Sequence, residues 1–161
     1  MVETRGTGAL TRLADTALAH EIEFLTVKAF ADGTRIVNAR LDELGLRARS
    51  YSVLALACSG LDVTQRELAA ALELDPSQIV ALVDGLEASD LVHRVQDPRD
   101  RRSRIVQATP AGRALFKRAQ KLTSEAEAAA LAMLSDTERE TLREILRKIV
   151  FAGGGQTLVP R

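Results

Sequence analysis

Residues 97–112 read Asp97-Pro98-Arg99-Asp100-Arg101-Arg102-Ser103-Arg104-Ile105-Val106-Gln107-Ala108-Thr109-Pro110-Ala111-Gly112. Short apolar runs at residues 91–95 and 105–108 predict two strands joined as a β-hairpin. Hairpin tips ordinarily favour Gly, Asn and Asp, because the turn backbone needs them. Here arginine and proline take the turn positions, so several guanidinium groups stand at the tip. This composition indicates that the tip meets an anionic partner.

The chain of 161 residues is long enough for one ordinary domain with helical extensions, and its apolar fraction of 46% is ample for a core. Aromatic residues make up only 3%, so the core must consist of Leu, Ala and Val, which suits closely packed helices. A single cysteine, Cys58, excludes an internal disulfide framework and fits a reducing cytoplasm. No signal peptide or bilayer-spanning run is present, so we expect a soluble cytoplasmic protein without membrane association.

The formal net charge is zero, because Lys and Arg total 22 and so do Asp and Glu. That balance counts against a nucleic-acid-binding protein. The charge is segregated, however: residues 92–118 hold eight Lys or Arg side chains against two Asp, a local net charge of +6 with His93 neutral. Because the local field steers a polyanion, this segment predicts an interaction with nucleic acid.

Helical periodicity extends from residue 9 to residue 44, with one apolar stripe along it. Asp32-Gly33 is a point where this helix is expected to bend or break. So much helix is not needed to fill one small core, so the stripe is predicted to pack against a partner subunit. Gly45 then ends the region as a helix C-cap.

A helix-turn-helix is predicted between this region and the hairpin. After a loop at residues 46–50 and an apolar helix at 51–58, Thr64 and Glu67 form a capping box that opens a helix over 65–72. Asp75-Pro76 starts the next helix, which continues to about residue 88. That helix turns inward Ile79, Leu82, Val83 and Leu86, and outward Ser77, Gln78, Ala81, Asp84 and Gly85. The hairpin follows directly, which makes the unit winged.

Two more helices close the chain. Thr109-Pro110 caps a long helix predicted through residue 133, and Ser135 with Glu138 forms a second capping box. A triplet of glycines then begins a flexible tail at residues 153–161. The predicted fold is mainly α with a small β-hairpin wing: a winged helix-turn-helix at residues 45–110, flanked by long dimerisation helices at 1–44 and 111–152.

Three stretches, at residues 64–72, 75–87 and 97–112, closely resemble in order and spacing the helix-turn-helix and DxRDxR wing of the MarR-type regulators, and the resemblance covers nearly the whole chain. It implies an obligate homodimer, built by helices from both ends of each chain, that binds a pseudo-palindromic operator in double-stranded DNA. Each recognition helix would enter a major groove and each wing the adjacent minor groove, with half-sites about one helical turn apart. It also implies a transcriptional regulator, a repressor rather than an activator.

Two departures from the family pattern bear on this interpretation. Asp90 stands where relatives usually have Gly in the tight turn before the wing; Asp can adopt a left-handed conformation at some cost, so the turn is expected to survive. Ala81 and Gly85 occupy outward positions where relatives often have Arg or Lys, which removes direct guanine contacts.

The remaining polar groups favour half-sites that contain A·T pairs. Gln78 can pair bidentately with adenine, Ser77 can bond to either base, and Ala81 or Val80 can contact thymine methyls. Either Arg101 or Arg102 is expected in the narrow minor groove of an A·T tract, braced by Asp97 or Asp100. The residues expected at DNA are Ser77, Gln78, Ala81, Arg99, Arg101, Arg102, Arg104, Gln65, Arg66, Arg49 and Ser50.

Each of these assignments has a simpler alternative. The wing could be a solvated hairpin with local salt bridges, and Ser77, Gln78 and Ala81 the solvent face of an amphipathic helix. Helix amino termini attract phosphate, which favours Gln65, Arg66, Arg49 and Ser50, but many surface arginines touch nothing. A winged-helix protein-interaction module without DNA binding is the main rival, and a small enzyme is the third possibility.

Other chemistry is poorly supported. Cys58 lies among Leu and Ala residues, where a thiol stays protonated, so it is expected to fill the core rather than sense oxidants. His20 and His93 have no partner at metal-ligand spacing, so no metal or other cofactor is expected. No nucleotide-binding glycine loop or catalytic set of side chains is present, which argues against an enzyme.

The resemblance further implies release from DNA by a small, often aromatic or lipophilic, anionic ligand. Its pocket would lie where the long amino-terminal helix meets the short second helix and the first closing helix. Arg40, Arg47 and Arg49 lie near this region and are candidates to meet a carboxylate. Ligand binding would change the separation of the two recognition helices.

Overall fold

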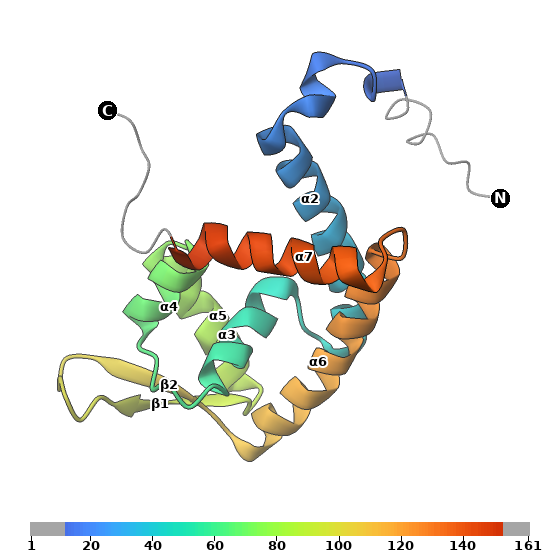
Figure 1. Cartoon of the computed structure of the whole chain (residues 1–161). Coiled ribbons are helices and arrows are strands. Elements are labelled where there is room, and N and C mark those ends of the chain that lie inside the picture. Colours follow the sequence, from blue (N-terminus) through green and yellow to red (C-terminus); the bar gives the residue numbers. More distant parts are fainter. Residues whose placement is uncertain (1–11, 153–161) are drawn as a thin grey trace, which may run out of the picture.

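The computed structural model describes residues 12–152, and Figure 1 shows a mainly helical chain with one two-stranded antiparallel hairpin. The predicted fold class is therefore confirmed. The elements in chain order are η1 (Ala17–His20), α2 (Ile22–Leu41), η2 (Asp42–Leu44), α3 (Ala48–Ala57), α4 (Gln65–Leu72), α5 (Pro76–Ala88), β1 (Val92–Gln96), β2 (Arg104–Ala108), α6 (Pro110–Ala130), α7 (Asp136–Arg147) and the π-helical turn η3 (Lys148–Ala152). The tail expected from residue 153 lies outside the described residues. No helix in the described part is both long and apolar enough to cross a membrane.

The hydrophobic core lies among α3, α4, α5 and the hairpin, and α2 and α6 contribute to it. Its largest fully buried side chains are Leu41, Leu54, Leu68, Ile79, Ile105, Val53, Val83, Val92 and Val106. Each such side chain stabilises the fold by about 1.5–3 kcal/mol when it leaves water. As the sequence predicts, α5 buries Ile79, Val83 and Leu86 and turns its polar face to solvent.

The predicted helix starts are confirmed by their capping hydrogen bonds. At α4, the Thr64 hydroxyl accepts from the Glu67 amide at 3.2 Å, and the Glu67 carboxylate accepts from the Thr64 amide at 2.7 Å. Ser135 and Glu138 make the same reciprocal pair at α7. These bonds satisfy amides that a helix leaves without an internal partner, and they fix where each helix begins.

Left-handed backbone occurs at turns that the fold needs. Gly45 has φ +67° after η2, as predicted for a C-cap, and Asp90 has φ +54° in the turn before β1, so that turn survives without glycine. Glu73, at φ +51° between α4 and α5, is a left-handed residue that the sequence does not predict. A left-handed non-glycine residue costs about 1–2 kcal/mol, which the surrounding helix packing must offset.

Several predicted boundaries at the amino-terminal side are wrong. The helix expected from residue 9 to 44 is interrupted at residues 14–21, but α2 runs unbroken through Gly33, because one glycine in a long helix costs only about 1 kcal/mol. The third helix starts at Ala48 rather than residue 51. There the Ala48 amide donates to Asn38 Oδ1 at 2.7 Å, and Ser50 Oγ accepts from the Arg47 amide at 2.9 Å.

The later elements need smaller corrections. Both strands are shifted or extended by one residue, since β1 ends at Gln96 and β2 begins at Arg104. The helix expected through residue 133 ends at Ala130, and a turn connects it to α7.

A close backbone approach ties the hairpin to α6. The Thr109 hydroxyl accepts from the Gly112 amide at 2.9 Å and donates to the Asp90 carbonyl at 2.7 Å, which draws the start of α6 onto residues 90 and 91. A Cβ on Gly112 would stand 1.9 Å from the Leu91 carbonyl oxygen. Only glycine fits there without displacing the wing from the helix.

We expect Gly112→Ala to lower the free energy of unfolding by about 3 kcal/mol, because an added methyl group must push apart two backbones. Gly85→Ala is the control: a Cβ at Gly85 meets nothing within 4 Å, so this change should stabilise α5 by up to about 1 kcal/mol. Urea denaturation of the two variants measures both effects. Equal stability of Gly112→Ala and the wild-type protein would contradict the close approach.

Candidate nucleic-acid interface

One side of α5 is exposed to solvent and largely polar. Ser77, Gln78, Ala81 and Asp84 are exposed along it, and Val80 is 45% exposed. Gln78 Oε1 accepts from the Asp75 amide at 3.2 Å, so its oxygen takes part in capping α5 and only its NH₂ group is free to donate. The bidentate adenine pair expected from the sequence needs both groups, so the Gln78 oxygen would have to accept a second hydrogen bond or release the Asp75 amide.

Two aspartates shape the turn of the wing. Asp97 Oδ1 accepts from the Arg99 amide at 2.8 Å, and Asp100 Oδ1 accepts from the Arg102 amide at 3.0 Å. Asp100 Oδ2 also accepts from the Ser103 hydroxyl at 3.0 Å. Such side-chain-to-backbone bonds replace the glycine or asparagine that a tight turn otherwise uses.

Among the arginines of the turn, Arg99 is the one whose guanidinium pairs with an aspartate. Asp97 is buried, and it accepts from Arg99 Nε and Nη2 at 3.0 Å each in a two-point ion pair. These hydrogen bonds hold the pKa of Asp97 below its ordinary value. The folded wing therefore favours the ionised carboxylate: its contribution is complete above the ordinary Asp pKa and disappears as the pH falls through the lowered value.

The other wing arginines have no carboxylate partner among the described residues. Arg101, Arg102 and Arg104 are exposed and form no ion pair there. Asp100 binds the backbone amide of Arg102 rather than its side chain. The turn thus presents guanidinium groups to solvent while its two carboxylates point inward to the turn.

A segment outside the hairpin fastens the wing to the helices. The Val106 amide donates to the Val63 carbonyl at 2.9 Å, and Thr64 forms an isolated antiparallel bridge with Ile105. Arg99 Nη2 adds a long contact of 3.5 Å to the Asp62 carbonyl. The sequence does not predict that Val63 and Thr64 pair with β2, because so short a bridge has no periodicity in the sequence.

The four phosphate candidates lie at the starts of two different helices. Gln65 is at the beginning of α4, where its Oε1 accepts from Arg94 Nε at 3.2 Å, and Arg66 next to it is exposed and unpaired in the described structure. Arg49 and Ser50 lie in the first turn of α3. The other end of that ten-residue helix, about 15 Å away, borders the wing strand β2 in a shared groove.

Cys58 and the histidines give no indication of a reactive thiol or a metal site in the described part of the chain. Burial raises the pKa of the Cys58 thiol, with Arg113 acting in the opposite direction, and the side chain packs partly buried against the core. This environment fits an unreactive thiol. Within the described residues, no three His, Cys, Asp or Glu side chains converge as a metal site would require.

The comparison with known proteins agrees with this geometry. The MarR family model matches residues 44–103. A MarR-family transcriptional regulator from Rhodococcus sp. RHA1, known from an X-ray crystal structure, is 41% identical with a TM-score of 0.81, over 86% of this chain and 98% of that one. The chain belongs to the MarR family. It is therefore a transcriptional regulator and not an enzyme, as the sequence predicts.

Other family members show what relatives bind. CouR from Rhodococcus jostii RHA1, crystallised with p-coumaroyl-CoA, is 38% identical with a TM-score of 0.77, over 91% of this chain and all of that one. A MarR variant from Escherichia coli in complex with operator DNA is 25% identical with a TM-score of 0.69, over 78% and 90% of the two chains. The putative transcriptional regulatory protein for the hcr operon of Thauera aromatica is 31% identical over 105 residues; the match covers 65% of this chain and 63% of that protein's length.

Proposed function

We propose that this MarR-family protein is a homodimeric repressor that binds a pseudo-palindromic operator in the cytoplasm. The observation that carries the proposal is the pairing of two features on one unit: the uncovered polar face of α5, and the unpaired Arg101, Arg102 and Arg104 at the wing. The operator complex of the Escherichia coli relative supports it. In this arrangement residues 45–110 read DNA, while residues 1–44 and 111–152 join the subunits.

In the proposed complex α5 lies in a major groove and the wing in the adjacent minor groove. Ser77 and the NH₂ group of Gln78 reach acceptors on base edges, and Ala81 and Val80 contact thymine methyl groups. Arg101 or Arg102 enters the minor groove, which is narrow and electronegative over A·T tracts. Arg66 and Arg104 contact phosphates, as do Arg49 and Ser50, and Arg99 stays with Asp97 and supports the turn.

We expect Arg101→Ala and Arg102→Ala each to weaken operator binding about 10-fold or more at moderate salt. The slope of log affinity against log salt should become shallower by about one for each phosphate that the variant no longer neutralises. Fluorescence anisotropy on a duplex selected in vitro from a random library measures both quantities. The variant that lacks the minor-groove arginine should also show a weaker preference for A·T tracts.

Lys121→Ala is the matched control, because the Lys121 side chain is 80% exposed on α6 and lies outside the positively charged segment of residues 92–118. It should leave affinity and salt slope unchanged. If wild-type protein selects no sequence and shows no salt-dependent affinity for DNA, the protein-interaction alternative replaces this proposal.

The proposed subunit interface consists of apolar surface that the chain leaves uncovered. None of the twelve residues of α7 is buried, although one side of it is strongly apolar. Large apolar side chains are exposed on both ends of the described chain, including Ile22, Leu25, Val27, Phe30, Ile145, Leu146, Ile149, Val150 and Phe151. Large exposed apolar surface marks sites of protein association, so a second copy is the occupant that we propose.

Replacing Ile145 and Ile149 together by Glu should weaken the dimer at least about 100-fold, because two carboxylates would enter an apolar interface. Leu61→Glu is the control: Leu61 is also exposed, at 73%, but lies in the turn between α3 and α4. Sedimentation velocity across a concentration series reports the association. A wild-type protein that sediments as a monomer at every concentration would contradict the proposed dimer.

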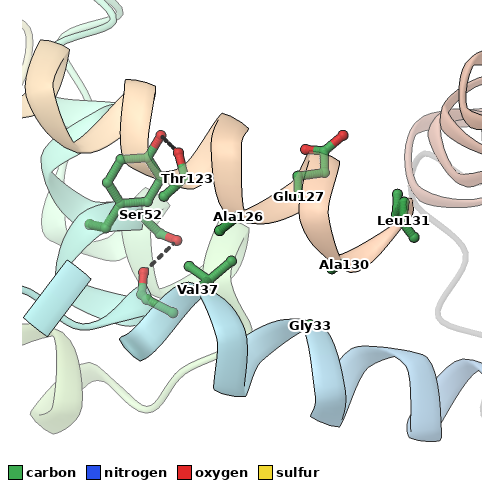
Figure 2. A pocket seen from close by; sticks show the side chains of 10 residues that line it. Gly33, Val37, Ser52, Thr123, Ala126, Glu127, Ala130 and Leu131 are labelled. Carbon is green, nitrogen blue, oxygen red and sulfur yellow. Dashed lines mark hydrogen bonds between the residues drawn. The ribbon is translucent and has the colours of Figure 1, made fainter. Parts of the chain in front are cut away.

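A small effector is the second part of the proposal, and a pocket supports it. A cavity of about 450 Å³ lies between α2, α3 and α6, where the family resemblance places it. Figure 2 shows Gly33, Val37, Ser52, Thr123, Ala126 and Leu131 around it. Its other lining residues are Ala48, Tyr51, Glu127 and Ala130.

The lining surface is mainly apolar and contains no basic residue. Of the cations expected to meet a ligand carboxylate, Arg47 pairs with Asp42 at 3.0 Å, Arg40 pairs with Glu43 at 3.8 Å, and neither lines the cavity, nor does Arg49. Glu127, the one charged lining residue, pairs with Arg143 at 3.2 Å. The pocket therefore fits an uncharged aromatic group, with any anionic part of the ligand outside, an arrangement that an aryl thioester such as that bound by CouR would allow.

We expect p-coumaroyl-CoA or methyl p-coumarate to bind at least about 10-fold more tightly than free p-coumarate, because a bare carboxylate loses its water in an apolar cavity. Isothermal titration calorimetry measures the three affinities. Ala130→Leu, which places three more carbon atoms in the cavity, should weaken binding while the thermal midpoint stays close to that of the wild type. Tighter binding of the free acid would contradict the assignment of the pocket to an uncharged group.

A further inference from the structure

Arg94 is a point at which three elements meet. It lies on β1, and its side chain is only 18% exposed. Nε donates to Gln65 Oε1 on α4 at 3.2 Å, Nη2 contacts Asp84 Oδ1 on α5 at 2.5 Å, and Nη1 pairs with Glu87 Oε2. One guanidinium therefore connects the first strand of the wing to both helices of the helix-turn-helix.

The attachment to α5 extends over two turns of the helix. Nη2 also approaches the Val80 carbonyl at 3.5 Å, and Val80, Asp84 and Glu87 have the spacing of one side of a helix. Glu87 in addition accepts from the Arg94 backbone amide at 3.0 Å. The strand is thus held to the helix through backbone as well as side chain, which restricts both the distance and the angle between them.

The ion pairs of Arg94 also reduce the positive charge that this part of the chain has available for DNA. Asp84 and Glu87 lie on the helix that is to approach DNA, and their side chains are 60% and 39% exposed. Arg94 offsets one of their two negative charges, which weakens their repulsion of phosphates. With Nε, Nη1 and Nη2 all engaged, Arg94 itself has little capacity left for DNA, although the local net charge of +6 includes it.

We propose that Arg94 is a positioning residue for sequence discrimination: it fixes the angle between α5 and the wing, and it does not contact DNA. The inference rests on the proposed operator binding. Contacts to bases require α5 and the wing to be positioned relative to each other within roughly 0.5 Å and 10–20°. Phosphate contacts made by flexible arginines tolerate larger errors, so loss of Arg94 should affect specificity before it affects general affinity.

The test compares Arg94→Lys with the wild type on a duplex selected in vitro and on a scrambled duplex of the same composition. Lys keeps the charge but cannot hold Gln65, Asp84 and Glu87 together. Affinity for the selected duplex should fall about 10-fold or more, whereas affinity for the scrambled duplex and its salt slope should stay within about 2-fold of the wild type. Arg118→Lys on α6 is the matched control and should change neither.

A second variant keeps the test decisive if Arg94→Lys folds poorly, as thermal unfolding and circular dichroism would show. Glu87→Ala removes the acceptor of both the Arg94 backbone amide and its side chain, and should reproduce the loss of discrimination. The double variant should lose no more than the stronger single one, because both act through one contact. Equal losses on both duplexes would show that Arg94 serves general affinity rather than discrimination, and would overturn the inference. Unchanged discrimination in both variants would also overturn it, whereas failure of the wild type to bind DNA would overturn the proposed function itself.

Discussion

A two-stranded hairpin is not stable in water by itself, so everything that the wing does depends on how it is fastened to the helices. Hydrogen bonds attach the hairpin to the helices at three places. The Val106 amide bonds to the Val63 carbonyl at one edge, Glu87 holds the Arg94 amide at the other, and Thr109 draws the end of β2 onto residues 90 and 91. The hairpin is therefore bonded along both edges and at its base, and only its turn is free.

The arginines of the wing also divide into those that are paired with a carboxylate and those that are not. Arg94 on β1 and Arg99 in the turn have carboxylate partners that also bond to backbone amides, so these two arginines support the structure of the wing. Arg101, Arg102 and Arg104, at and after the turn, have none in the described chain. A protein with no net charge can thus offer a strongly positive tip, because its acidic residues are placed where they fix the turn rather than where they would mask it.

Local signals in the sequence predicted most of the fold. Thr64 with Glu67, Ser135 with Glu138, and Asp75-Pro76 each fix a helix start through bonds that span only three residues, and all three starts are where the pattern placed them. The beginning of α3 was missed because its Ala48 amide bonds to Asn38, ten residues earlier. Such a contact depends on how α2 and α3 pack, and no pattern within one helix contains that information.

The candidate site divides in the same way. The outward face of α5 and the arginine-rich turn follow from periodicity and composition, and the structure places both as expected. What the residues do within the site could not be predicted. Gln78 caps its own helix, Gln65 bonds to Arg94 from a position 29 residues away in the sequence, and Asp97 holds Arg99 rather than Arg101 or Arg102. Each assignment depends on which partner comes within hydrogen-bonding distance after folding, so a residue type that can bind DNA is not evidence that its polar atoms are free to do so.

α3 connects the proposed effector pocket with the elements that are proposed to bind DNA. Its first half contributes Ala48, Tyr51 and Ser52 to the pocket, and its buried Val53 and Leu54 lie in the core with Ile79 and Val83 of α5. Its last residues border β2. A ten-residue helix moves as a rigid unit, because its interior is close-packed and bends little. A ligand that widened the gap between α3 and α6 would therefore displace α5 and the wing together. In the proposed dimer this would alter the spacing of the two DNA-reading units while leaving each unit intact.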